Sequence, residues 1–206
     1  VKSGTVADLT QLEKGNNKFS IGKKNSGTEG SGRQLLSGLD INAEKFSLAY
    51  MGYGGSADAL QNGTIDGMNI PAGVPVSAIT RAYAAMGDKV KVLDFTDEQM
   101  KEANGDYTLW TRYVIPANTY PGQTKAINTI AQPNFLASRS DLPEEDVYLL
   151  TKSLYENLTY LSAIHKATAV MPIEKAIAGL PVPLHPGAAR YYREQGIEIP
   201  AHLVAN

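Results

Sequence analysis

The chain has 206 residues and a formal net charge of −2, and 43% of its residues are hydrophobic while 19% are charged. This composition is typical of a globular protein with one large or two small cores, and no apolar run approaches the roughly 20 residues of a membrane-spanning helix. With no cysteine, the sequence excludes disulfides and thiolate metal sites within these residues, which fits an oxidising compartment such as the periplasm. The weak net charge argues against nucleic acid as a partner, because such binding needs a concentrated basic face.

The first residues predict a helical turn but no targeting signal. Thr5 to Leu12 reads as a capped amphipathic turn. Val1 to Gly4 contains no initiator methionine and does not read as a signal peptide. We therefore expect the chain to begin inside a fold, as a processed product or as a fragment.

A glycine-rich stretch from Gly22 to Gly32 separates the apolar 19–21 segment from a helix expected over 31–37, which ends at Gly38. A strand that turns into a helix in this way leaves backbone N–H groups unpaired beside the positive end of the helix dipole. Such a turn suits a carboxylate or a phosphate. The glycine spacing matches neither the P-loop nor the dinucleotide fingerprint. An ordinary turn capped by Ser26 or Thr28 explains the same residues equally well.

Strands and helices then alternate along the next part of the chain, which predicts βαβ units and a mostly parallel sheet. Strands are expected at 46–51, 64–70 and 90–95, and helices at 56–60, capped by Ser56, and at 76–86, after Pro75.

The pattern changes near residue 96. A short helix is expected at 97–103, and two strands are expected at 109–115 and 125–131, the second of which can continue over 135–138. The remainder reads as helical, and Pro143 followed by three acidic residues is a strong helix-start signal. These late helices are expected at 144–158, 160–168, 173–178 and 187–195.

Three segments end a strand and enter a helix, namely 25–30, 53–56 and 69–75. In an open parallel sheet such segments lie along one edge, where ligands bind. One ligand touching two or three of these loops is therefore our functional interpretation, and tight connecting turns are the alternative.

Catalytic and metal-binding patterns are weak. The histidines do not stand at metal-ligand spacing from one another or from paired carboxylates, and His185 before Pro186 is expected to cap or pack a helix start. Glu29 could act as a base, but capping and the helix dipole explain it equally well. No Ser–His–Asp set can be nominated. We therefore predict no catalytic residue, no metal and no cofactor.

Four segments, in order along the chain, carry a resemblance to a known family. The terminal Leu-His-Pro-Gly-Ala-Ala-Arg-Tyr-Tyr-Arg-Glu-Gln-Gly of 184–196 is long enough to be specific. The others are Asn-Ser-Gly-Thr-Glu at 25–29, Asp66-Gly67 followed by Ala-Gly-Val-Pro at 72–75, and the helix at 146–157. The chain resembles the TAXI family, the solute receptors of TRAP transporters.

This resemblance implies a periplasmic-binding-protein-like α/β fold of type II, with a mostly parallel sheet and C-terminal helices that complete or abut a second lobe. It implies a periplasmic receptor that does not itself span the membrane, that captures a small carboxylate such as glutamate, glutamine or a dicarboxylate, and that delivers it to TRAP-type permease subunits. Together with the strand-end argument, it nominates ten ligand-binding residues, which are Asn25, Ser26, Gly27, Thr28, Glu29, Asn69, Pro71, Ala72, Gly73 and Val74.

Members of that family are longer, so we expect the N-terminal part of the receptor to be missing here. Residues 1–108 would form the ligand-binding lobe, and 109–206 would hold return crossover strands and the C-terminal helical region. The alternative function is a small α/β enzyme that uses Glu29 or His185 on a phosphorylated or carboxylated substrate. A third is an interaction domain with a degenerate ligand site.

Overall fold

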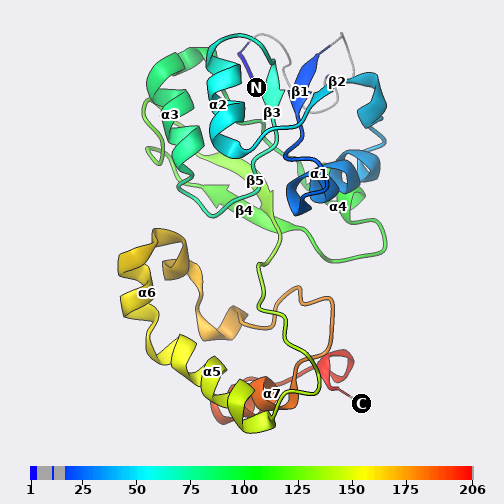
Figure 1. Cartoon of the computed structure of the whole chain (residues 1–206), viewed down its shortest axis with the longest axis vertical. Coiled ribbons are helices and arrows are strands. Elements are labelled where there is room, and N and C mark those ends of the chain that lie inside the picture. The colour runs from blue at the N-terminus through cyan, green and yellow to red at the C-terminus, as the bar shows by residue number, and fades with distance from the viewer. Residues whose placement is uncertain (4–10, 12–16, 206) are drawn as a thin grey trace. The chain divides into compact units, whose positions relative to one another are not determined.

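A computed structural model describes residues 1–3, 11 and 17–205, and the chain forms two compact units, Val1–Ala131 and Gln132–Asn206 (Figure 1). Most of the turn expected over 5–12 lies outside the described residues. Both units combine helices with irregular segments, and the described strands belong to the first. The expected division at 108/109 follows from the family resemblance. Its assignment of 109–131 to return crossover strands stays a prediction, and these residues belong to the first unit.

The first unit contains the expected parallel sheet. Its strands β1 (Lys18–Ser20), β2 (Ser47–Ala49) and β3 (Gly67–Met68) lie in the order β2-β1-β3, with Phe19 opposite Leu48 on one side and Gly67 on the other. The strands are shorter than predicted. The mixed α/β architecture with a parallel sheet is that of a periplasmic-binding-protein-like fold, as expected.

Helices cover both faces of this sheet (Figure 1). Phe19 and Ile21 form a buried cluster with Leu36 of α1 (Gly27–Gly38). On the opposite face, the Ser20 hydroxyl lies 2.7 Å from that of Ser56 in α2 (Tyr53–Gln61). Successive strand side chains point to opposite faces, so α1 and α2 flank the sheet.

Two helices of the first unit, α1 and α2, start three or more residues before their predicted starts. Helix α1 begins at Gly27, four residues early, because the Ser26 side chain accepts a hydrogen bond from the Glu29 amide and so caps it. Helix α2 begins after Gly52, so Ser56 lies inside the helix and is not its cap. Its hydroxyl is buried and instead shares a hydrogen bond with Ser20 of the sheet.

The expected strand at 90–95 is wrong. Within the described residues, only an isolated bridge joins Val90 to Lys2. The backbone of Lys91 exchanges two hydrogen bonds with Val1, whereas the Phe95 amide donates to the Asn128 carbonyl. The segment divides its hydrogen bonds between two neighbours and forms no continuous ladder.

The rest of the first unit follows the prediction closely. After α3 (Ser77–Met86), the helix α4 (Asp97–Asn104) starts in a capping box between Thr96 and Gln99. Strands β4 (Thr111–Ile115) and β5 (Ile127–Ala131) form an antiparallel pair. Short 3₁₀ turns at Ala43–Lys45 and Gly87–Lys89 complete the unit.

The second unit is helical, as expected, although two of its predicted helices differ. The helix expected at 173–178 is only a short 3₁₀ turn, and the one expected at 160–168 is divided between an α-helix and a 3₁₀ turn. Its helices are α5 (Glu144–Glu156), which starts after Pro143, α6 (Leu158–Ile164) and α7 (Pro186–Glu194), with 3₁₀ turns at Lys166–Val170, Ile173–Lys175 and Ala201–Leu203. The expected continuation of a strand over 135–138 is wrong, because these residues are exposed and have no regular structure. Among the described helices, none combines the length and apolarity of a membrane span.

Candidate functional site

The predicted anion loop leads from β1 into the N-terminus of α1. The backbone reverses at Gly22, with φ of +116°, and at Asn25, with φ of +61°. A Cβ on Gly22 would lie 2.7 Å from the Thr28 side chain, so glycine is required both for the conformation and for the space. The Ser26 hydroxyl donates to the Lys23 carbonyl at 2.6 Å and accepts from the Glu29 amide. Helix geometry leaves the amides of Gly27 and Thr28 without intrahelical partners, and Gly27 has open space around it.

The second predicted loop, 69–74, is joined directly to this helix start. The Asn69 side-chain amide donates to the Thr28 carbonyl at 3.0 Å, while the Asn69 backbone amide donates to the Ser20 carbonyl. Glycine at position 32 leaves room for the Asn69 side chain, because a Cβ on Gly32 would lie 2.6 Å from the Asn69 Nδ2 atom. The structure therefore brings the two loops together, as expected.

Tyr53 links the same two loops, and the sequence-based site did not include it. Its hydroxyl donates to the Pro71 carbonyl at 2.7 Å and lies 3.2 Å from the Thr28 hydroxyl. Ala72 and Gly73, just beyond, are exposed, and Val74 is half-buried. The glycine-rich segment 53–56 after a predicted strand was the signal that could have nominated Tyr53.

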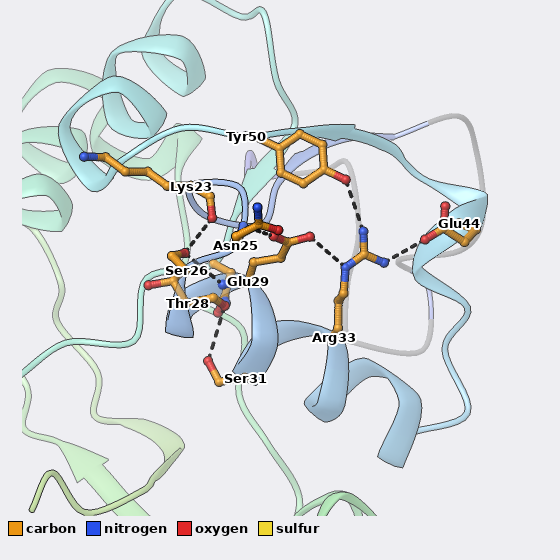
Figure 2. A network of polar contacts seen from close by, with 10 residues as sticks. Lys23, Asn25, Ser26, Thr28, Glu29, Ser31, Arg33, Glu44 and Tyr50 are labelled. Atoms are coloured by element: carbon orange, nitrogen blue, oxygen red, sulfur yellow. Dashed lines mark hydrogen bonds and ion pairs between the residues drawn. The ribbon is translucent and has the colours of Figure 1, made fainter. Parts of the chain in front are cut away.

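Lys23 was also missed. A Cβ added to Gly52, the residue that caps α2, would lie 3.0 Å from Lys23 Cε, so the lysine side chain reaches the start of α2. In Figure 2 this side chain extends away from Glu29. An exposed ammonium group therefore adds positive charge where two helix N-termini already favour an anion.

Glu29 is committed to contacts within the protein. Its carboxylate accepts from the Asn25 backbone amide at 2.6 Å and from Arg33 Nε at 3.0 Å, and Arg33 also binds Glu44 and Tyr50 (Figure 2). The Asn25 amide, followed by Arg33, holds the pKa of Glu29 below its ordinary value. A carboxylate paired in this way is a poor general base.

The other catalytic candidate, His185, caps a helix in the second unit. Its Nδ1 accepts from the Gly187 amide at 3.2 Å, and its Nε2 lies 3.2 Å from the Leu142 carbonyl. The expectation that it caps a helix start is confirmed. In the described part of the chain, no three His, Asp or Glu side chains gather as metal ligands would.

A model of the NMT1-like family matches residues 1–196. The chain belongs to the NMT1-like family. This family is of the periplasmic solute-binding type, so it indicates transport and binding in general, with a ligand and a transporter as partners. Its members are typically extracytoplasmic and are binding proteins, which favours binding over catalysis for the loops described above.

Proposed function

We propose that this chain is an extracytoplasmic receptor of the TAXI type, which captures a small carboxylate and delivers it to TRAP-type permease subunits. The observation that supports the proposal most strongly is the junction of the two ligand loops at the N-terminus of α1. There Asn69 and Tyr53 hold the Thr28 and Pro71 positions together.

The ligand's carboxylate would be bound by the free amides of the first turn of α1, because these donors and the helix dipole favour an anion. The Ser26 and Thr28 hydroxyls, the exposed Lys23 and the loop 71–74 would border it. Glutamate-like molecules and dicarboxylates are the ligands that the TAXI resemblance implies. The enzyme alternative lacks support, since both Glu29 and His185 are engaged in structural hydrogen bonds.

Isothermal titration calorimetry of the purified protein tests this proposal. We expect saturable binding of at least one carboxylate from a panel of acidic amino acids, glutamine, dicarboxylates and monocarboxylates, with no chemical change in the ligand. The proposal fails if no carboxylate of any of these classes binds, or if the protein turns one of them over.

Two glycines of α1 provide a matched pair of variants. Neither Gly27 nor Gly30 has another atom within 4 Å of an added Cβ, so both alanine variants should fold. Only Gly27→Ala places a methyl group beside the free first-turn amides, and we expect it to weaken carboxylate binding by about tenfold. Gly30→Ala should bind normally, and equal affinities for the two variants would contradict the site.

A further inference from the structure

A cavity of about 220 Å³ lies inside the first unit, beside α1. Apolar side chains from four separate segments line it, including Leu35 of α1, Ile70, Ile79 of α3 and Leu93. Each of these is only half-buried, so the cavity communicates with the surface and is not a sealed packing defect.

The cavity adjoins the proposed carboxylate site through the residues that join its two loops, whereas Lys23, Gly27 and Thr28 are not among its lining residues. Ser31, Gly32, Asn69 and Pro71 line it as well. Asn69 donates to the Thr28 carbonyl, and the Pro71 carbonyl accepts from Tyr53, so the residues that join the two loops also form one wall of the cavity. A ligand held at the α1 N-terminus would have the rest of its body beside this opening.

The lining favours an apolar body. Among the described residues that line the cavity, Lys91 has the only charged side chain, and no aspartate or glutamate is present to receive an ammonium group. Placing an unpaired ammonium against such walls costs desolvation energy, as does placing a second carboxylate anywhere but beside Lys91, whereas burying hydrocarbon there is favourable. The chemistry of the walls therefore disfavours a zwitterionic amino acid.

The volume sets the size of that body. An engineered apolar cavity of about 150 Å³ accepts benzene, so one of 220 Å³ accommodates about six to eight carbon atoms.

We propose that the ligand is a monocarboxylate with a compact branched or aromatic hydrocarbon body, its carboxylate at the α1 N-terminus and its body in this cavity. This inference rests on the proposed carboxylate receptor and narrows its ligand class away from glutamate and the dicarboxylates.

Trp110 provides a local reporter, because it lines the cavity and is the only tryptophan of the 206 residues. Its fluorescence is titrated with 4-methylpentanoate, 4-methylpentanamide, glutamate and glutarate, and calorimetry measures the same four affinities. We expect 4-methylpentanoate to shift the emission and to bind about tenfold or more tighter than each of the others.

A pair of leucine variants ties the body of the ligand to the cavity. Leu35→Phe fills space in the lining and should weaken 4-methylpentanoate binding by about tenfold, whereas Leu39→Phe changes a half-buried leucine outside the lining and should not. Circular dichroism and thermal melting establish that both variants are folded, and a second filling variant, Ile79→Phe, replaces Leu35→Phe if that one is not.

Each contrary result has a separate meaning. Tighter binding of glutamate or glutarate overturns the inference and leaves the carboxylate receptor standing. Equal binding of the neutral amide, or unchanged binding in the folded filling variant, also overturns the inference. If no carboxylate binds at all, the proposed function itself fails, and the inference fails with it.

Discussion

At the scale of single residues, the candidate site consists of polar atoms that are mostly used within the protein. Thr28 and Asn69 bond to neighbouring loops, and Glu29 bonds to Asn25 and Arg33. What is left for a ligand is backbone N–H and an exposed lysine, which is a donor set for an anion. Binding is therefore expected to depend more on glycine at 27 than on any one acidic or basic side chain.

The titration of Glu29 checks this description. Its pKa lies below the ordinary value of 4.5, first because of the Asn25 amide and then because of Arg33. Since the folded pKa is lower than the unfolded one, the ionised group stabilises the fold above pH 4.5, and this contribution disappears as the pH falls through the lowered value.

Carbon-13 NMR of the side-chain carboxyl groups measures this pKa directly, with Glu29→Gln used to assign the resonance. We expect Arg33→Gln to move the Glu29 pKa back upward, because it removes one of the causes of the lowered value. A Glu29 pKa at or above 4.5 in the unmodified protein would contradict the network drawn in Figure 2.

At the scale of elements, close packing of α1 against α4 holds the site-bearing helix in place. A Cβ on Gly38 would lie 2.9 Å from both the Cα and the carbonyl oxygen of Ala103 in α4. The sequence suggested that Gly38 simply ends its helix. The left-handed conformation after α1 belongs instead to Asp40, with φ of +54°, so Gly38 is explained by packing.

Replacing Gly38 therefore has a definite expected cost. We expect Gly38→Ala to lower the free energy of unfolding by about 1–3 kcal/mol, as overpacking against a backbone does. Gly30→Ala, on the same helix but in open space, should raise it by about 0.5–1 kcal/mol through helix propensity. Urea denaturation followed by circular dichroism compares the two, and a loss of stability only in Gly30→Ala would be incompatible with the packing.

Local chemistry made most helices predictable. Helix α5 starts after Pro143, which is followed by three acidic residues, and helix α4 starts after Thr96, which caps it together with Gln99. Both helices begin within one residue of their predicted starts. The failures have tertiary causes. Ser56 has the residue type of a helix cap, but its hydroxyl shares a hydrogen bond with Ser20 of the sheet. The apolar 90–95 segment divides its backbone hydrogen bonds between separate neighbours. Glycine-rich turns in the sequence also indicated the two loops that the structure joins at the start of α1, whereas the contacts of Tyr53 and Lys23 with these loops depend on packing that sequence spacing does not reveal.

At the scale of the whole molecule, the candidate site and the cavity belong entirely to the first unit, whereas the terminal family motif belongs to the second. In that segment the guanidinium carbon of Arg190 lies 3.8 Å from the centroid of the Tyr148 ring. Arg190 also forms ion pairs with Glu144 and Glu145, so α7 is fixed on α5. Gly187 lies where an added Cβ would be 2.7 Å from the Tyr148 amide. The segment that carries the resemblance to the TAXI family thus has a packing role.

An exposed segment near the start of the second unit should be open to proteases. Residues 134–141 are exposed and almost without backbone hydrogen bonding, and Arg139 lies within them. We expect brief trypsin treatment to cut after Arg139 and to release a fragment that begins at Ser140, as read by mass spectrometry. Arg139→Gln should remove this product, and its persistence in that variant would show that another bond is the weak one.

The two hydrogen bonds of Asn69, one from its backbone and one from its side chain, limit which positions of the proposed site can change. Its backbone amide extends the pairing of a two-residue strand, and its side chain fixes the start of α1, so a substitution there disturbs the sheet and the site together. Gly27, Ala72 and Gly73 are exposed, and Gly27 has no atom within 4 Å of an added Cβ. New ligand preferences are therefore easiest to acquire at these positions, while the scaffold around Asn69 stays fixed.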